Sequence, residues 1–419
     1  MIPFSKRELS SGFKQRKAQK LTGKLLLLSF FAMALQGNNS FQMWAEKVSS
    51  MTGKYVSKQA IWKRINAFYI KFLVAVLSDV LREQIGRVSK HLEQGALKNR
   101  YKRILIQDST ALALPSCLRW CFPGNTVRGE QKAQLKIQVI YDLLNSRFIY
   151  FELTPFTAND QSKSKDILDI AGKEDLVIRD LGYFSLDCFD QLNSQHTSFV
   201  SRLKYGVKTT DVDTGKELNL LKILKTQGCF DRWVCIGGKQ QIKLRLVALA
   251  MPEEQANRRR HKAKCDRDLR LNHTKEYYQQ LAYSIFITTE SENQFTAMQI
   301  AKLYGLRWRI ETIFKCWKSQ FHLQKIIPQH TSLTKERIEA VLYMMLIFIL
   351  LFQVTVFNYL LRISQTANIS LTKLSRYIAN NFKSFLEINL RALTPNLLRY
   401  CKYDTRKDRL NYLQKLKLG

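Results

Sequence analysis

Residues Leu303 to Phe321 read LYGLRWRIETIFKCWKSQF. Wound as an α-helix at about 100° per residue, this stretch gathers one polar stripe within roughly 80° of arc. The stripe carries a single carboxylate among cations: Tyr304, Arg307, Glu311, Lys315 and Lys318. Because the adjoining face is apolar, the helix is predicted to lie on a hydrophobic core and to present the stripe to a ligand.

The spacing within this stripe is specific. A glutamate can hold a metal ion, and cations beside it can hold phosphate oxygens. A solvated helix face crossed by ion pairs has the same composition. However, Tyr304, Arg307, Glu311 and Lys318 match the Tyr-Arg-Glu-Lys signature of the insertion-sequence 4 family of cut-and-paste DDE transposases, and the chain resembles that family.

The overall charge indicates a polyanionic partner. The 419 residues carry 67 Lys and Arg against 34 Asp and Glu, a formal net charge of +33. Nucleic acid is the first candidate partner and an anionic membrane surface is the second. With 46% hydrophobic residues, the chain can bury one large core or two to three smaller ones.

Two features bear on the compartment. The eight cysteines show neither CxxC pairs nor zinc-type Cys/His spacing, which favours reduced thiols in a reducing cytoplasm. The family resemblance implies that this is a bacterial cytoplasm and that the protein is associated with the nucleoid when it is bound to DNA. Residues 340 to 361 form an apolar run about as long as a bilayer span. Because this run follows the stripe helix closely, it is better explained as that helix's support, and no membrane partner is expected. A basic membrane-associated protein is the competing hypothesis.

Two apolar strands are each predicted to end in an aspartate. Residues 103 to 110 contain Asp108, and residues 175 to 180 end in Asp180. A carboxylate at a strand end can project into a site, although such an aspartate is also a common turn former. Alternation over residues 134 to 141 and 147 to 153 indicates a hairpin, in which Asp142 is a turn residue.

This order of elements predicts an α/β fold. Three antiparallel strands, a helix, a strand, a helix and a strand resemble the ribonuclease-H-like mixed-sheet catalytic core of the family, with a mostly β insertion and helical N- and C-terminal regions. The predicted domains are a helical DNA-end-binding domain (1–98), the first part of the catalytic core (99–204), the insertion (205–281), the last part of the core with the Glu311 helix (282–330) and a helical C-terminal region (331–419). Residues 57 to 65 are either the second helix of a helix-turn-helix or part of an ordinary basic helical hairpin.

The resemblance implies a two-metal site. Asp108 and Asp180 correspond to the family's first two metal-binding aspartates and Glu311 to its third ligand, so Asp108, Asp180 and Glu311 are the expected catalytic residues. Two Mg²⁺ ions about 4 Å apart, with Mn²⁺ as a substitute, serve phosphodiester cleavage of this kind. Asp108 is expected to bridge both ions.

The remaining candidates are DNA contacts. Arg307, Lys318 and Lys315 are expected to hold phosphates, while Tyr304 either donates a hydrogen bond to a phosphate or packs on the sheet. The resemblance implies a hairpin intermediate with a flipped base, for which Trp308, Tyr283 and Trp233 are candidates in that order, unless they are core residues. Arg259 and Lys262 belong to a basic cluster that is either a phosphate-tracking loop or a solvated one.

Together these features predict a DNA transposase. It would bind the terminal inverted repeats of an insertion sequence as double-stranded DNA, cleave the ends and join them to target DNA. The family resemblance implies a homodimer, because two ends must be cut together. The alternative is a transposase-derived DNA-binding protein without cleavage activity. Glu276, Glu290 and Glu292 are weaker candidates for the third ligand, because none lies on a helix face with cations.

Overall fold

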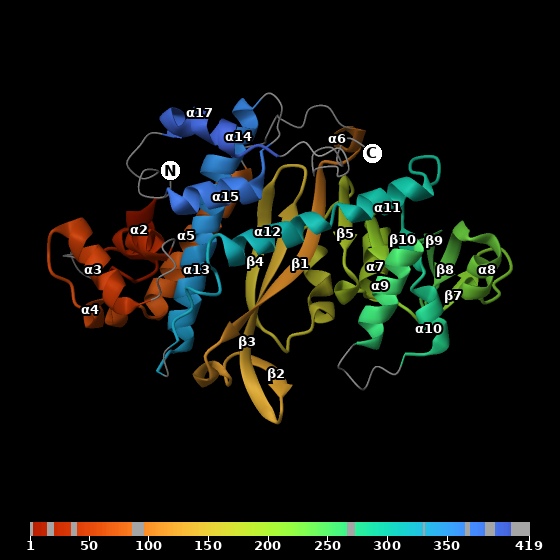
Figure 1. Ribbon diagram of the computed structural model, residues 1–419, viewed down its shortest axis with the longest axis horizontal. Coiled ribbons are helices and arrows are strands. Elements are labelled where there is room, and N and C mark those ends of the chain that lie inside the picture. Colours follow the sequence, from red (N-terminus) through yellow and green to blue (C-terminus); the bar gives the residue numbers. More distant parts are fainter. Residues whose placement is uncertain are drawn as a thin grey trace. The chain divides into compact units, whose positions relative to one another are not determined.

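The computed structural model describes residues 3–14, 21–34, 40–85, 96–265, 273–329, 332–364, 369–381 and 390–403 (Figure 1). The chain forms two compact units. Unit 1 comprises Met1–Glu93, Ser109–Ala158 and Arg309–Leu413, and unit 2 comprises Gln94–Asp108, Asn159–Trp308 and Gln414–Gly419. The last residues of the predicted C-terminal region, 404–419, lie outside the described part.

Unit 2 is built on a mixed sheet. The first residues of β1 (Arg103–Leu114) pair in parallel with β5 (Asp175–Arg179), and β5 pairs in parallel with β6 (Ser198–Arg202). The order continues through antiparallel neighbours, namely β10 (Tyr283–Thr288), β9 (Ile242–Ala250), β8 (Cys229–Ile236) and β7 (Thr209–Asp211). Every residue of β5 is buried, as expected for a central parallel strand covered on both faces.

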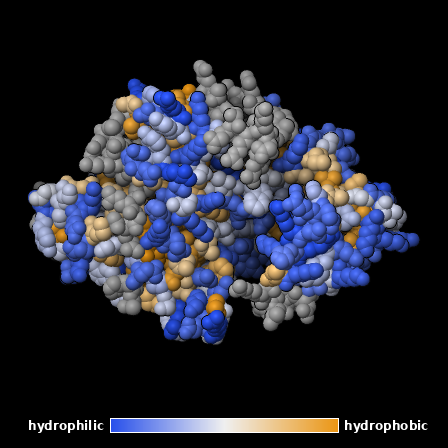
Figure 2. All heavy atoms as spheres, viewed as in Figure 1, coloured by the Kyte–Doolittle hydropathy of each residue, from blue (hydrophilic) through white to orange (hydrophobic). Residues whose placement is uncertain are grey.

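The helices of unit 2 are α6 (Ala96–Arg100), α7 (Leu186–Ser194), α8 (Leu220–Gln227), α9 (Glu253–Lys264), α10 (Lys275–Gln280) and α11 (Ala297–Gly305), with 3₁₀ turns at Asp160–Ile167 and Leu181–Tyr183. Residues 205–281, the predicted insertion, therefore contain three helices beside three strands. The basic cluster with Arg259 and Lys262 lies on α9 rather than on a loop, and the surface there is hydrophilic (Figure 2).

Unit 1 combines strands with a helical assembly. Its strands are the rest of β1, β2 (Pro123–Val127), β3 (Glu130–Asp142) and β4 (Arg147–Pro155). Its helices are α1 (Phe4–Ser10), α2 (Gly23–Ala34), α3 (Phe41–Thr52), α4 (Lys58–Arg64), α5 (Ala67–Ile85), α12 (Trp308–Ser319, from its second residue), α13 (Lys335–Phe352), α14 (Asn358–Ile363), α15 (Leu371–Asn380) and α17 (Leu390–Tyr400), with a π turn at Gln353–Phe357 and a 3₁₀ turn at Ser116–Leu118.

The strand order confirms the predicted core. In unit 1, β3 lies between β4 and β1, and in unit 2 the other end of β1 continues to β5 and β6. At the β3–β4 turn, Asp142 accepts hydrogen bonds from the backbone N–H of Asn145 (3.2 Å) and from Arg147 Nε (2.9 Å), which makes it the turn residue that the sequence predicts. The result is a ribonuclease-H-like mixed sheet with helical flanks.

The apolar C-terminal run is a core helix. The stretch Lys335–Leu361 is long and apolar enough to cross a membrane, but 82% of its most apolar window is buried inside the protein. Within it, Phe348 packs edge-on against Phe31 of α2 and against Phe321, which follows α12. Tyr69 of α5 donates its hydroxyl to Met344 Sδ (3.4 Å). The run thus supports the region around α12, as its position in the sequence predicts.

The N-terminal helices match the predicted pair of short helices. Ser40 caps α3 and Ser57 caps α4, each through its side-chain oxygen, and Gly53 ends α3 with a left-handed φ of 66°. The sequence therefore specifies this hairpin locally. Whether α4 contacts DNA stays a prediction.

We predict that Trp317→Ala lowers the free energy of unfolding by about 3–5 kcal/mol, because it removes a large core side chain. Trp317 of α12 is 2% exposed and packs against Phe148 and Phe151 of β4. Urea unfolding followed by circular dichroism measures the change. Met298→Ala on α11, where the side chain is 59% exposed, is the control and should change stability by less than about 0.5 kcal/mol. Equal effects would contradict this role for Trp317.

Candidate active site

Strand register brings the two aspartates together. β1 pairs with β5 from Arg103↔Asp175 through Gln107↔Arg179, and the next residues of the two strands are Asp108 and Asp180. Neighbouring strands lie about 4.8 Å apart, so the two carboxylates emerge side by side. The prediction that β1 ends near Asp108 is wrong, because the strand continues to Leu114. Asp108 instead marks the point at which β1 stops pairing with β5.

The predicted single helix over residues 303 to 321 is also wrong. α11 ends at Gly305 and α12 begins at Trp308. Between them, the N–H groups of Leu306 and Arg307 donate to the carbonyls of Leu303 and Tyr304, three residues back, at 3.0 Å each. Such bonds wind the chain more tightly than an α-helix does, and Gly305 opposes helix continuation because it has no side chain. Tyr304 therefore lies near the end of α11, Arg307 lies in the turn between the helices, and the rest of the stripe lies on α12.

Arg307 sits on the aspartate pair. Its Nη1 lies 3.4 Å from Asp108 Oδ2 and its Nε lies 3.6 Å from Asp180 Oδ1. The Arg307 side chain is only 10% exposed, whereas the side chains of Asp108 and Asp180 are 17% and 39% exposed. One guanidinium thus offsets the repulsion between two neighbouring carboxylates that solvent can still reach.

Tyr304 completes this cluster. Its hydroxyl donates to Asp180 Oδ1 (3.2 Å), and its ring contacts Phe286 of β10. Burial raises the pKa of Tyr304, and the negative charge of Asp180 raises it further. The phenol therefore stays protonated and remains a hydrogen-bond donor at neutral pH.

Two arginines lie beside this cluster: Arg259, which was a candidate from the sequence, and Arg202, which was not. Arg202 is the last residue of β6, and the register Arg179↔Ser201 places it next to Asp180. Arg259 of α9 donates to the carbonyl of Tyr283 (3.3 Å) and to Ser284 Oγ (3.4 Å). Burial, followed by repulsion from Arg202, lowers the pKa of Arg259 to about 10.

These two arginines favour an anionic ligand. Among the described residues neither Arg202 nor Arg259 forms an ion pair with a carboxylate. An anion such as a phosphate would relieve their mutual repulsion. For Arg202, the available signal was its place at the end of a strand parallel to the one that precedes Asp180. Arg259 was found through its basic cluster, but its place beside Arg202 depends on the packing of α9, which the sequence does not show.

The remaining stripe residues lie together on α12 in unit 1. Glu311, Lys315 and Lys318 line an open hollow of about 460 Å³ with Phe314 and Ser319. Glu311 is half-buried and both lysines are exposed. Partial burial lowers the pKa of Lys318. The cations one and two turns after the glutamate are thus arranged as the spacing predicts.

The aromatic candidates lie in different surroundings. Trp308 is 59% exposed, and the Arg307 guanidinium lies 5.5 Å from its ring centroid. Tyr283 on β10 donates its hydroxyl to the carbonyl of Leu224 (3.2 Å). Trp233 on β8 donates its indole N–H to Glu292 (3.1 Å), and β9 and β10 separate β8 from β6. Of these three rings, only that of Trp308 is therefore exposed beside the aspartate cluster. Lys262, the remaining candidate phosphate contact, is exposed on α9.

The donor set partly fits a divalent cation. Adjacent carboxylates supply the hard oxygen ligands that Mg²⁺ prefers, and Asp108 and Asp180 provide them in unit 2. Within the described ranges, no group of three Asp, Glu, His or Cys side chains lies close enough to hold a metal ion. Glu311 belongs to unit 1. In this structure Arg307 supplies the positive charge at the aspartates.

Comparisons with known proteins agree on one family. A family model described as the transposase DDE domain matches residues 100–351. The transposase for insertion sequence element IS231F of Bacillus thuringiensis subsp. israelensis is 31% identical over 332 residues, which cover 74% of this chain and 68% of that protein. The IS231D transposase of B. thuringiensis subsp. finitimus is 29% identical over 83% of this chain and 75% of its own length. The IS1151 transposase of Clostridium perfringens is 27% identical over 83% of this chain and 76% of its own length.

A solved structure is also similar. It is the synaptic complex of piggyBac transposase with hairpin DNA, which aligns over 97% of this chain and 84% of that one. The sequence identity is 12% and the TM-score is 0.42, a level at which neither fold nor ligand can be carried over.

We predict that Arg307→Met strengthens Mn²⁺ binding by about tenfold, because a cation no longer has to displace a guanidinium from Asp108 and Asp180. Electron paramagnetic resonance of free Mn²⁺ in titrations of the full chain measures the affinity. Arg258→Met, at an exposed position of α9, is the matched control and should leave the affinity unchanged. Unchanged or weaker binding by Arg307→Met would show that Arg307 does not compete with the metal.

Proposed function

Because this chain belongs to the DDE transposase family and is a DNA transposase that cleaves and joins DNA strands, we propose that Asp108, Asp180 and Glu311 are its metal-binding catalytic residues. The observation that carries this proposal is the register of β1 and β5, which sets Asp108 and Asp180 side by side at the end of their pairing. Glu311 supports it as the one carboxylate in the stripe residues of α12, with Lys315 and Lys318 beside it.

The proposed cofactor is a pair of Mg²⁺ ions, which Mn²⁺ can replace. Asp108 would contact both ions, and Asp180 and Glu311 would hold one each. When bound, such ions activate the attacking hydroxyl and stabilise the leaving oxygen of a phosphodiester. The two carboxylates of unit 2 are already oriented together by the sheet, so their arrangement needs no reorganisation of the strands.

Arg307 has two roles in this proposal. Without metal it offsets the charge of Asp108 and Asp180 at 3.4 and 3.6 Å. With cations held by Asp108 and Asp180, the guanidinium would be free to bind a phosphate of the cleaved end. Tyr304 keeps its hydroxyl on Asp180, and Lys318 and Lys315 hold further phosphates. These roles agree with the Tyr-Arg-Glu-Lys signature of the insertion-sequence 4 family, to which we assign the chain.

The proposed substrates are the terminal inverted repeats of an insertion sequence and the target DNA into which its ends are joined. The formal charge of +33 suits double-stranded DNA at several surfaces, and α4 is a candidate for recognising the repeats. A homodimer would hold two ends for concerted cutting. All eight cysteines are free thiols, which fits the reducing bacterial cytoplasm, where the nucleoid supplies the DNA.

We predict that the wild-type protein cuts a DNA fragment carrying the gene's own flanking sequence when Mg²⁺ or Mn²⁺ is present. Glu311→Gln, Asp108→Asn and Asp180→Asn should each lose at least about 10³-fold in cleavage rate while still binding the fragment, because each removes a charged metal ligand. Gel analysis of end-labelled fragments, with parallel binding assays, measures both properties.

Glu292→Gln is the matched control for this experiment, since it removes an exposed carboxylate that interacts with Trp233 outside the cluster. It should cut like the wild type. Binding without cutting by the wild-type protein would favour the transposase-derived DNA-binding protein. Cutting by Glu311→Gln at the wild-type rate would exclude Glu311 as a ligand.

We further propose that excision passes through a DNA hairpin and that Trp308 stacks on the flipped base. Its exposed ring beside Arg307 supports this role. Trp308→Ala should lower hairpin formation by about 5- to 150-fold, the usual cost of losing one stacked base, and Trp308→Phe should retain most of it. Denaturing gels resolve the hairpin product. Trp233→Ala is the control, and a larger defect in that variant would transfer the role to Trp233.

A further inference from the structure

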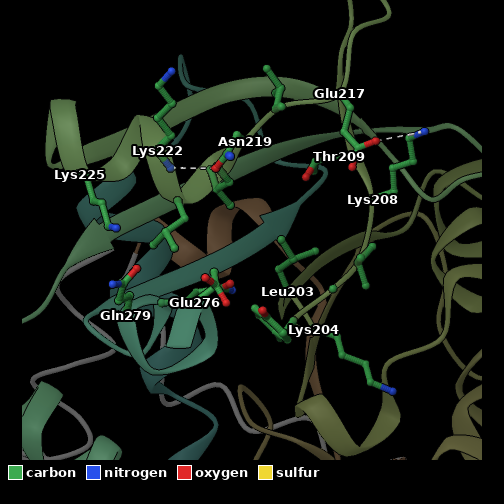
Figure 3. Close-up of a pocket in the computed structure, with 17 residues that line it drawn as sticks. Leu203, Lys204, Lys208, Thr209, Glu217, Asn219, Lys222, Lys225, Glu276 and Gln279 are labelled. Atoms are coloured by element: carbon green, nitrogen blue, oxygen red, sulfur yellow. Dashed lines mark hydrogen bonds and ion pairs between the residues drawn. The ribbon is translucent and has the colours of Figure 1, made fainter. Parts of the chain in front are cut away.

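Unit 2 contains a polar groove of about 680 Å³ that the proposed function does not use (Figure 3). It lies between the chain that follows β6, the helix α8 and the helix α10. The lining residues that bear on its binding chemistry are Lys204, Tyr205, Lys208, Glu217, Lys222 and Lys225.

The groove carries an excess of positive charge. Four of its residues are lysines and two are glutamates, and one glutamate, Glu217, pairs with Lys208 at 3.3 Å. Among the described residues Lys204, Lys222 and Lys225 form no ion pair with a carboxylate. Lys204 and Lys225 lie on opposite sides of the groove in Figure 3, and both lysines are exposed.

The groove also contains a fixed aromatic ring. Tyr205 is 40% exposed, and its hydroxyl lies 2.8 Å from Thr274 Oγ1. Its ring meets Tyr277 edge-on at 5.2 Å, and Tyr277 in turn stacks on His273 at 4.1 Å. These contacts hold the Tyr205 ring in one orientation, so a base that stacks on its free surface loses little additional side-chain entropy.

The position of the groove connects it to the aspartate cluster. Its first residues, Leu203 and Lys204, directly follow Arg202, which lies beside Asp180 at the end of β6. Two residues of extended chain span about 7 Å. A nucleic acid strand whose phosphate is held near Arg202 can therefore extend into the groove.

We propose that this groove binds a single-stranded segment of DNA, with phosphates on Lys204 and Lys225 and a base stacked on Tyr205. Cations that follow a backbone and an exposed aromatic ring are the combination that single-strand sites use. In a duplex the bases are stacked on one another and cannot lie on the Tyr205 ring. The groove therefore discriminates in favour of unpaired DNA, independently of the metal-binding carboxylates.

The test measures anisotropy of a fluorescein-labelled oligothymidylate and of a labelled duplex with the full-length protein in EDTA, so that no cleavage is required. Lys204→Gln combined with Lys225→Gln should weaken oligothymidylate binding by about tenfold or more and lower its salt dependence by a slope of about 1.4. Tyr205→Ala should weaken it by about 5- to 150-fold, and Tyr205→Phe should retain it. Duplex binding should change by less than about twofold in each case.

Lys173→Gln combined with Lys239→Gln is the matched control, because both lysines are exposed in unit 2 and outside the groove lining. It removes the same charge and should bind both probes like the wild type. Equal losses in the control and groove variants, or equal losses on duplex and oligothymidylate, would overturn the proposal. Failure of the carboxylate variants to lose cleavage would not affect this outcome, since the assay contains no metal.

Discussion

The proposed active site depends on the parallel register of β1 and β5. Because Gln107 pairs with Arg179, the carboxylates of Asp108 and Asp180 emerge from adjacent strands at the same level. Two such charges about 5 Å apart repel each other by roughly 3 kcal/mol at an effective dielectric of 20. A cation must therefore accompany them, and in this structure it is the guanidinium of Arg307. The strand pairing thus places two negative charges side by side, and either an arginine or a metal ion can offset them.

The break between α11 and α12 determines how Arg307 approaches the two aspartates. A continuous helix would leave Arg307 in regular α-helical geometry, whereas the i to i+3 hydrogen bonds at Leu306 and Arg307 tighten the chain where the arginine approaches the aspartates. Beyond the break, α12 is held by its apolar face, where Trp317 packs on strand β4. Glu311 is therefore positioned by the core of unit 1 and the aspartates by the sheet of unit 2. Of the four signature residues, Tyr304 and Arg307 therefore belong to unit 2, whereas Glu311 and Lys318 belong to unit 1.

Sequence reasoning succeeded where the signal was local. Alternating apolar residues and the turn chemistry of Asp142 indicated the hairpin and the mixed sheet correctly, because both are determined within a few residues. The break at Gly305 was missed because Leu306 and Arg307 still fit a helical alternation of apolar and polar residues. The continuation of β1 past Asp108 was missed because aspartate is a common turn former and was therefore taken to end the strand. Arg259 was a candidate because of its basic cluster, but its place beside Arg202 was not foreseen, since it arises only from the packing of α9.

The distribution of positive charge explains why one protein can offer several surfaces to DNA. With 67 Lys and Arg against 34 Asp and Glu, at least 33 cations have no carboxylate available, whatever the pairing. Some arginines are used internally, as Arg245 is with Asp231 and Arg103 with Asp175. Every such internal pair uses one cation and one carboxylate, so the whole excess of 33 cations remains for other positions. The unpaired positive charge therefore lies at exposed positions. A DNA strand that runs from Arg202 into the polar groove of unit 2 would lower the repulsion among these charges.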